Sequence, residues 1–264
     1  MGEQFDAALD AGLVALGLAD TEAASALARR SYEAHARLLR EWNAAINLTA
    51  IRDPEAMARR HVCDALSAVE PIQALTVPGA SLLDVGSGSG YPGLPLAAAL
   101  PVARVGLLDS VGKKARFLAA AGEAVSAVLA ERAAAEAGAG YGSPTITAIA
   151  ERAEDIAEEY GQRESWDIVV VRAVGSLAEV LELGLPLARE GGVVVAWKRE
   201  EEGGALRREL QGAGSIIRAA GGGRPRVVAA EAGILPDHRL VIVPKERTTP
   251  ITYPRPASVR RTRR

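Results

Sequence analysis

The residues best suited to chemistry are a glycine-rich segment and two carboxylates, Asp84 and Asp109. Residues 86–93 read GSGSGYPG and directly follow an apolar run at 81–85 that contains Asp84. Glycines at alternate positions after a strand allow positive φ and let backbone N–H groups approach a ligand closely. Asp109 ends the next apolar run, where a carboxylate accepts hydrogen bonds from both hydroxyls of a ribose. The pattern indicates a ribose-containing ligand at the carboxyl ends of two strands.

The type of loop narrows the ligand further. The dinucleotide pattern G-x-G-x-x-G needs glycine at position 91, which is Tyr91, and a P-loop needs Gly-Lys-Ser/Thr, which does not follow these glycines. An anion such as Asp84 repels a pyrophosphate but suits a cationic ligand. S-adenosylmethionine, with its sulfonium, amino group and ribose, fits these residues. We predict contacts from Asp84, Gly86, Ser87, Gly88 and Asp109. The alternative is a structural turn with two solvated carboxylates.

The residues after the fourth predicted strand address the atom that accepts a methyl group. Enzymes that methylate exocyclic or amide nitrogens carry Asn/Asp-Pro-Pro-aromatic there, whereas this chain has Arg172, Ala173 and Val174. Attack through pyrimidine carbon needs a Cys nucleophile, but the only Cys, Cys63, lies in a predicted helix ahead of the glycine loop, where a small buried Cys is commoner. The sequence shows no acidic cluster for metal-dependent O-methylation. Guanine N7 needs neither deprotonation nor covalent activation, so alignment with the methyl group is sufficient for transfer. The absence of a general-base motif is compatible with this acceptor but does not single it out.

Alternating short β-runs and helices position these residues. Strands separated by helices and apolar on both faces favour a parallel sheet covered on both sides, and the last two strands should pair antiparallel because only a Gly/Pro-containing connector joins them. The predicted strands are 81–85, 104–108, 145–149, 167–171, 192–197, 226–231 and 239–244. The predicted helices are 25–42, 54–70, 93–100, 112–137, 152–160, 176–188 and 203–220, with a linker at 71–80.

Composition and charge bound the class of protein. The 264 residues, 48% hydrophobic and 24% charged, predict a globular fold. A single Cys excludes an internal disulfide framework. With only three scattered His in addition, the chain cannot form a His/Cys-rich metal cluster. The net charge of −2 conceals a polar layout, since residues 1–28 hold five acids and no Lys or Arg, while 255–264 hold five Arg and no acid. With no secretory signal or membrane-spanning run, we expect a soluble, cytoplasmic protein.

The chain resembles a known family, the bacterial small-subunit ribosomal RNA guanine-N7 methyltransferases, also called the glucose-inhibited division protein B family. The resemblance covers about residues 35–256 and rests on an ordered set of motifs. The first motifs are Trp42-Asn43, Asn47-Leu48-Thr49-Ala50, Arg60-His61 with Asp64, residues 83–88, Gly93-Leu94-Pro95-Leu96 and Leu107-Leu108-Asp109-Ser110 with Lys113-Lys114. The later ones are Arg152-Ala153-Glu154, Arg172-Ala173-Val174, Ala196-Trp197-Lys198, His238, Thr249-Pro250 and Tyr253-Pro254-Arg255.

The resemblance implies an α/β fold, a Rossmann-like seven-stranded class I S-adenosylmethionine-dependent methyltransferase sheet with a small N-terminal helical region. It divides the chain into a helical region at 1–75, a methyltransferase domain at 76–246 and a basic tail at 247–264. The implied activity is methylation of N7 of one guanosine in 16S ribosomal RNA or the small ribosomal subunit, by a monomer without a metal or a membrane partner.

The resemblance also assigns residues to roles. Gly86 and Tyr91 would touch the cofactor, Asp109 and Ser110 its ribose, Ala153 and Glu154 its adenine, and Arg172 the junction of cofactor and base. Arg172 and Lys198 would be catalytic, and Asn47, His61, Lys198 and Arg255 would lie on the RNA side. Some have plainer explanations: Arg172 pairing with a surface acid, His61 capping a helix or lying at the core edge, Lys198 as solvated charge, and Glu154 favoured by a helix dipole.

Three segments depart from the family's pattern. Lys198 is followed by Arg199-Glu200 rather than Gly, the Ala/Gly segment 136–143 is longer than usual, and the tail from Arg255 keeps basic character without the family's motif. The predicted phosphate contacts are the tail and Arg29, Arg30, Arg37, Arg40, Arg59 and Arg60. Two other readings stay open: a small-molecule methyltransferase of the same fold, and a non-catalytic protein that binds S-adenosylmethionine.

Overall fold

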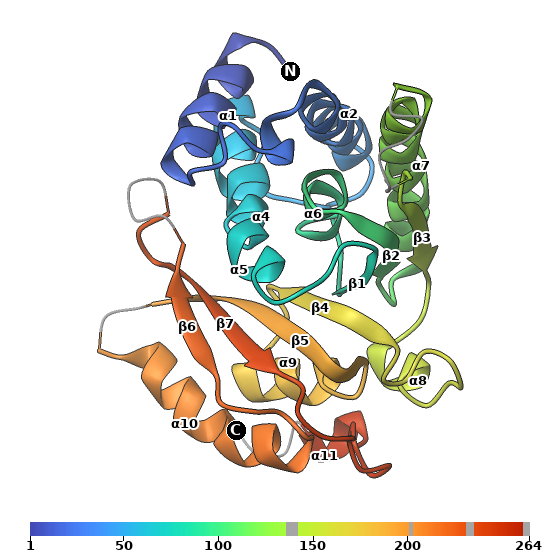
Figure 1. Cartoon of the computed structure of the whole chain (residues 1–264), viewed down its shortest axis with the longest axis vertical. Coiled ribbons are helices and arrows are strands. Elements are labelled where there is room, and N and C mark those ends of the chain that lie inside the picture. The colour runs from blue at the N-terminus through green and yellow to red at the C-terminus, as the bar shows by residue number, and fades with distance from the viewer. Residues whose placement is uncertain (136–141, 201–202, 231–234, 261–264) are drawn as a thin grey trace.

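A seven-stranded sheet with the order β3-β2-β1-β4-β5-β7-β6 forms the centre of the molecule (Figure 1). This computed structural model describes residues 1–135, 142–200, 203–230 and 235–260. The strands are β1 (Ala80–Val85), β2 (Val102–Leu108), β3 (Thr145–Ile149), β4 (Trp166–Arg172), β5 (Ala188–Arg199), β6 (Arg226–Ala229) and β7 (His238–Pro244). Strands β1 to β5 pair in parallel, while β7 runs antiparallel to both β5 and β6. This is the predicted class I methyltransferase sheet.

The seven predicted strands are confirmed, with ends displaced by a few residues. The largest displacement is in β5, which begins at Ala188 because Ala188 already pairs with Trp166, and the ladder changes register before Ile168. The predicted antiparallel pairing of the last two strands is also confirmed. The sequence does not predict that β7 inserts between β5 and β6, since that order depends on contacts between distant segments.

Helices cover both faces of the sheet (Figure 1). Those before β1 are α1 (Glu3–Ala15), η1 (Glu22–Ala24), α2 (Ala26–Asn43), α3 (Pro54–Met57), η2 (Ala58–Cys63), α4 (Asp64–Leu66) and α5 (Val69–Gln73). Those after it are α6 (Gly93–Ala99), α7 (Gly112–Ala135), α8 (Ala153–Ile156), α9 (Leu177–Gly184), α10 (Ala205–Ala219) and α11 (Ala257–Arg260). No helix in these described ranges is long and apolar enough to cross a bilayer.

Three of these predictions need correction. The predicted helix at 176–188 is wrong at its end, since α9 ends at Gly184 and Ala188 already belongs to β5. The predicted helix at 152–160 is wrong beyond Ile156, because Arg163 bonds the carbonyl oxygens of Ala157, Thr249 and Tyr253 at 2.9–3.0 Å and holds this segment in turns against the C-terminal region. The predicted linker from residue 71 is wrong at its start, since α5 continues to Gln73. Pro71 lies in the first turn of α5, where a missing N–H costs no helical hydrogen bond. The end of the predicted 112–137 helix and most of the 136–143 segment lie outside the described residues.

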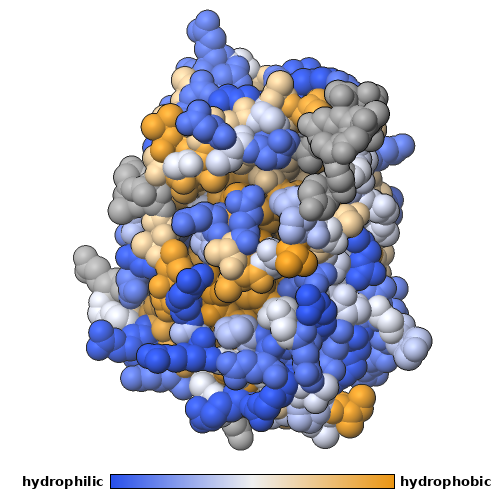
Figure 2. Space-filling model, in the orientation of Figure 1, coloured by the Kyte–Doolittle hydropathy of each residue, from blue (hydrophilic) through white to orange (hydrophobic). Residues whose placement is uncertain are grey.

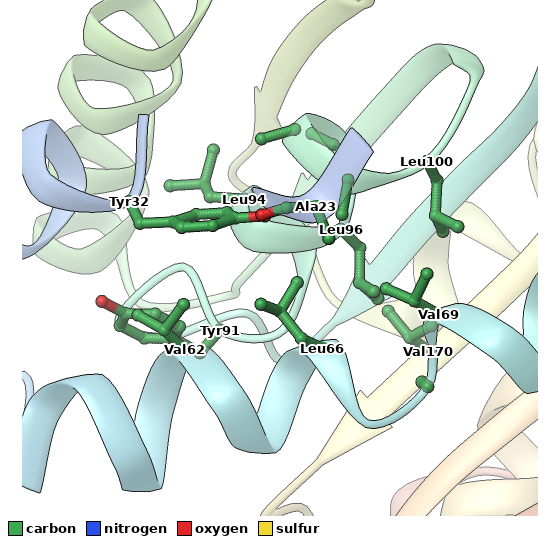
Figure 3. Close-up of a cluster of buried hydrophobic side chains, with 14 of the residues drawn as sticks. Ala23, Tyr32, Val62, Leu66, Val69, Tyr91, Leu94, Leu96, Leu100 and Val170 are labelled. Atoms are coloured by element: carbon green, nitrogen blue, oxygen red, sulfur yellow. The ribbon is translucent and has the colours of Figure 1, made fainter. Parts of the chain in front are cut away.

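The N-terminal helices share a hydrophobic core with the sheet. Tyr32 of α2, Leu66 of α4, Leu94 of α6 and Val170 of β4 belong to one buried cluster (Figure 3). A second cluster on the opposite face joins the sheet to α8, α9 and α10. Hydrophobic side chains also gather across the middle of the face in Figure 2, with hydrophilic ones above and below. The predicted boundaries near residues 75 and 246 stay a prediction.

A buried lysine attaches the C-terminal segment to the sheet. The ammonium of Lys245 lies 2.7 Å from a carboxylate oxygen of Glu164, 2.6 and 3.0 Å from the carbonyl oxygens of Leu185 and Ala188, and 2.8 Å from Oγ1 of Thr249. Burial lowers the pKa of Lys245, whereas Glu164 counteracts that shift. Glu164 also accepts the N–H of Thr249 at 2.6 Å.

We predict that Lys245→Met lowers the free energy of unfolding by about 3–5 kcal/mol, because it leaves the Glu164 carboxylate and two buried carbonyl groups without their cation. Chemical denaturation of both proteins measures the difference. The exposed Lys113→Met is the matched control and should change stability by less than about 0.5 kcal/mol. Equal losses in the two variants would contradict the role of Lys245.

Candidate functional site

The glycine loop between β1 and α6 is held by backbone hydrogen bonds, one within the loop and one to the end of β2. The N–H of Ser87 donates to Leu108 O at 2.9 Å, and that of Gly90 donates to Ser87 O at 2.8 Å. Gly86 has φ +72°, and a Cβ there would lie 2.6 Å from Cγ2 of Val174. The loop therefore requires glycine at residue 86 for both its conformation and its close contact with the segment after β4.

Asp84 lies beneath this loop and is fully buried. Its Oδ2 accepts hydrogen bonds from Ser87 Oγ at 2.7 Å and from the Gly93 N–H at 2.9 Å. Its Oδ1 is buried without a hydrogen-bond partner among the described residues. Burial raises the pKa of Asp84 to about 6, and these two hydrogen bonds oppose the shift. Asp84 thus organises the loop and places a carboxylate directly under it.

A cavity of about 300 Å³ opens above the carboxyl ends of β1 and β2 and contains Gly86, Asp109, Ser110, Ala153 and Glu154. The two carboxylate oxygens of Asp109 accept N–H groups of Val111 at 2.9 Å and of Gly88 at 3.1 Å. Each carboxylate oxygen has a second lone pair for another donor. Five residues that the sequence assigns to the cofactor therefore line one cavity.

A second cavity, of about 440 Å³, adjoins the first and shares Ala173 and Val174 with it. It contains Arg172, Lys198 and His61, three residues predicted to be catalytic or on the RNA side. Its remaining residues include Ile51, Arg60, Asp64, Val171, Gly175, Val180, Trp197, Arg199 and His238. We call the first the Asp109 cavity and the second the Arg172 cavity.

The Arg172 cavity is organised by Asp64, whose side chain is 3% exposed. Its Oδ2 accepts Arg172 Nη1 at 2.8 Å, its Oδ1 accepts His238 Nδ1 at 2.6 Å, and its carbonyl oxygen accepts Trp197 Nε1 at 2.9 Å. Burial would raise the pKa of Asp64, but the His238 hydrogen bond and the Arg172 charge outweigh it and lower that pKa. Asp64 follows η2, a π-helical turn, a feature that is frequent at functional sites.

Three stacked rings support the wall beside Arg172. Tyr91 lies between His35 and His61, with ring centroids 4.2 and 4.7 Å away, and the Arg172 guanidinium lies 5.5 Å from the Tyr91 ring centre. Burial lowers the pKa of His61 to about 3 and that of His35 to about 4, so both rings are neutral. Tyr91 is 2% exposed, lines neither of the two cavities, and reaches into the core near Val62 (Figure 3).

Three other predicted residues have different surroundings from those expected. Lys198 lines the Arg172 cavity, but its ammonium pairs with Glu209 at 2.7 Å and donates to Gly175 O at 3.1 Å. Asn47 is exposed and lines neither cavity. Arg255 also lines neither, because its guanidinium donates to both carboxylate oxygens of the buried Glu182 at 2.6 and 2.7 Å.

Sequence reasoning leaves Asp64, Trp197 and His238 without a role, although each lies in a quoted motif. In the sequence, the one indication of a role for these residues is that each belongs to a family motif. Only the fold shows that the three motifs meet. Asn43 is similar: its side chain accepts the N–H groups of Leu48 and Thr49 and so shapes the loop that places Thr49 Oγ1 2.9 Å from His61 Nε2.

The Asp109 cavity and the carboxylate buried beneath the glycine loop suit S-adenosylmethionine. Asp84 is buried beneath the glycine loop and does not line the cavity, but its unpartnered Oδ1 supplies negative potential for a cationic group. The remaining lone pairs of Asp109, beside Lys114, suit vicinal hydroxyls. Within the described part of the chain, no three His, Cys, Asp or Glu side chains are grouped so that they could hold a metal ion.

Comparison with known proteins identifies the family. Residues 29–214 match the family model described as rRNA small subunit methyltransferase G. The chain belongs to this family. Proteins named ribosomal RNA small subunit methyltransferase G are 38% identical in Symbiobacterium thermophilum, over 85% of both chains, and 34% identical in Dehalococcoides mccartyi, over 94% of both chains.

Similarity to solved structures is more distant. An O-methyltransferase from Bacillus cereus has a TM-score of 0.48 and 18% identity, covering 80% of this chain and 90% of that one. Membership of the family accounts for the class I sheet and for S-adenosylmethionine as cofactor.

The basic tail contributes to the fold as far as Arg260. Arg255 pairs with Glu182, and Arg260 of α11 pairs with Glu154 in the Asp109 cavity.

We predict that truncation after Pro254 destabilises the protein by about 3 kcal/mol, because the Glu182 carboxylate stays buried without its cation. Truncation after Arg260 keeps both pairs and is the matched control. Thermal unfolding of the two truncated proteins checks this, and equal midpoints would refute it.

Proposed function

We propose that this chain transfers the methyl group of S-adenosylmethionine to N7 of a guanosine in 16S ribosomal RNA, as a cytoplasmic monomer without a metal. Family membership makes the chain an S-adenosylmethionine-dependent methyltransferase of ribosomal RNA. The observation that supports the finer assignment is the shared wall at Ala173 and Val174, which puts the Asp109 cavity directly beside the Arg172 cavity, so that a cofactor in the first and a base in the second would be neighbours.

On the cofactor side, each predicted contact has a distinct task. Asp109 and Ser110 would hold the ribose, and Ala153 and Glu154 would lie beside adenine. Asp84 would supply a negative potential beneath the sulfonium and amino groups. Its Oδ2 already accepts hydrogen bonds from Ser87 and Gly93 and would not contact them. When bound, S-adenosylmethionine supplies an electrophilic methyl group on a sulfonium, whose sulfur keeps the electron pair of the broken bond.

On the acceptor side, the Arg172 cavity would orient a guanine, which needs no deprotonation at N7, and His238, whose ring also lines this cavity, would contact the base without acting on N7. His61 has a pKa of about 3 because it is buried beside Arg172, and both carboxylate oxygens of Asp64 are engaged, so neither is an effective base near neutral pH. Guanine N7 already has an in-plane lone pair. Holding it in line with the methyl group supplies up to about 7–11 kcal/mol in the best intramolecular cases.

Three arginines beside this cavity suit the RNA backbone. Arg59, Arg60 and Arg199 line a hollow next to the Arg172 cavity, together with Asp237, and make no ion pair with any residue that the structure describes. By contrast, Arg29 pairs with Asp10 at 2.5 Å and Arg30 with Glu131 at 2.6 Å, so their charges are balanced locally. We therefore place the main phosphate contacts at the hollow, which keeps the predicted Arg59 and Arg60 and adds Arg199, rather than at Arg29 and Arg30 of α2.

The direct test maps N7-methylguanosine by borohydride and aniline cleavage of 16S RNA, naked or in the small subunit, after incubation with the chain and labelled S-adenosylmethionine. We expect cleavage at one guanosine, dependent on both the chain and the cofactor. Label in the RNA without cleavage would overturn the N7 assignment. Label only in small metabolites would favour a small-molecule methyltransferase, and cofactor binding without any transfer would favour a non-catalytic binding protein.

The pKa of Asp84 predicts how cofactor affinity depends on pH. Burial raises that pKa to about 6, and a cationic ligand favours the carboxylate, so binding must displace a proton below pH 6. We predict that affinity for S-adenosylmethionine, measured by calorimetry, falls about tenfold between pH 7.5 and pH 5. Asp84→Asn should bind more weakly at pH 7.5 and lack this loss; taking the difference removes titration of the ligand itself. The same pH dependence in both proteins would exclude Asp84 as its source.

A further inference from the structure

The function proposed above assigns no specific task to the pair formed by Asp64 and His238. His238 is the first residue of β7 and lies opposite Arg199 in the ladder with β5. Its side chain is 17% exposed and lines both the Arg172 cavity and the neighbouring arginine hollow. Because the ring of His238 lies where the Arg172 cavity meets the hollow lined by Arg59, Arg60 and Arg199, it is well placed to contact the substrate.

The contact with Asp64 determines which nitrogen of His238 carries the hydrogen. Asp64 is a carboxylate, because its pKa is lowered, and a carboxylate only accepts hydrogen bonds. With Nδ1 2.6 Å from Oδ1 of Asp64, Nδ1 donates the hydrogen of this contact, and the tautomer compatible with it has no hydrogen on Nε2. Nε2 then carries a lone pair, and it makes no hydrogen bond to any residue that the structure describes. The Arg172 cavity therefore contains an acceptor whose tautomer is set by Asp64.

Asp64 also holds a donor beside this acceptor. Its second oxygen binds Nη1 of Arg172, so one carboxylate positions a guanidinium group and an imidazole at adjacent places. The remaining N–H groups of Arg172 are donors, and Nε2 of His238 is an acceptor. Guanine presents the complement, an acceptor at O6 next to a donor at N1–H. Adenine presents the reverse order at the same two positions.

We propose that His238, oriented by Asp64, selects guanine by accepting a hydrogen bond from N1–H while Arg172 donates to O6. This deepens the proposed function and rests on it. His238 is then a specificity-determining residue, and Asp64 is a positioning residue for both partners. Recognition at O6 and N1 leaves N7 free, and enzymes that act on an extruded base read it by hydrogen bonds to this edge.

The test places guanosine, inosine or 2-aminopurine at the mapped position of 16S RNA assembled by splinted ligation, and compares kcat/KM for methyl transfer. Inosine keeps O6 and N1–H, whereas 2-aminopurine lacks O6 and has an acceptor at N1. We expect the wild-type chain to methylate inosine within about fivefold of guanosine, and to prefer guanosine over 2-aminopurine by about 100-fold or more, because unpaired polar groups in a site reject the wrong ligand strongly.

Variants then identify the residue responsible. His238→Phe should reduce the preference to below about tenfold without changing affinity for S-adenosylmethionine. His238→Gln retains an acceptor near the position of Nε2 and should restore part of it. Asp64→Asn should behave like His238→Phe, because its amide N–H faces Nδ1 of His238 and moves the ring hydrogen to Nε2.

Arg199→Gln is the matched control, since Arg199 lies opposite His238 and lines the same cavity and hollow but makes no hydrogen bond to Asp64. It should raise KM for all three RNAs equally and leave the preference unchanged. An unchanged preference in His238→Phe or Asp64→Asn would overturn the inference while leaving the proposed function intact. A wild-type chain that transfers no methyl group to the guanosine RNA would instead overturn the proposed function, and the inference with it.

Discussion

A single buried carboxylate, Asp64, connects the parts of the chain that form the Arg172 cavity. It binds Arg172 from the end of β4, His238 from the start of β7, and Trp197 of β5 through its carbonyl oxygen. Removing a carboxylate from water is costly, and here the cost is offset by several hydrogen bonds and a cation. Because β4, β5 and β7 are neighbours in the sheet, the three partners meet only when β7 inserts beside β5. The cavity is therefore complete only in the fully assembled sheet.

The N-terminal helices are part of the site for a related reason. His35 of α2 and His61 of η2 enclose Tyr91 from both sides, and His35 Nε2 lies 2.7 Å from the Ser89 carbonyl oxygen. The glycine loop is thus held from below by Asp84 and from the side by α2. Burial keeps both imidazoles neutral, which lets them stack on Tyr91 without adding positive charge next to Arg172. The glycine loop and the Arg172 cavity are therefore both supported by the stack of His35, Tyr91 and His61.

Local patterns in the sequence are enough to predict the short strands and the glycine loop, since each depends on residues close together along the chain. The Asp109 cavity joins more distant segments, and only the family resemblance assigns Ala153 and Glu154 to the cofactor. Asp64 is different, because its partners Arg172 and His238 lie 108 and 174 residues away and nothing near it in sequence reveals them. Tyr91 shows the opposite difficulty. Its place in the loop motif suggests contact with the cofactor, whereas the two imidazoles that bury its ring come from helices outside the motif.

The distribution of charge on the surface also depends on contacts between segments that are distant in the sequence. The acidic first 28 residues and the arginines of α2 look like separate features in the sequence, but the fold brings Asp10 to Arg29, and Glu33 pairs with Arg37 along the helix. Such exposed pairs add little stability, yet they cancel charge on that surface. In the tail, Arg255 and Arg260 are likewise engaged by Glu182 and Glu154. Arg59, Arg60 and Arg199, which have no ion pair in the described residues, line the hollow beside the Arg172 cavity, so a net charge of −2 is compatible with RNA binding.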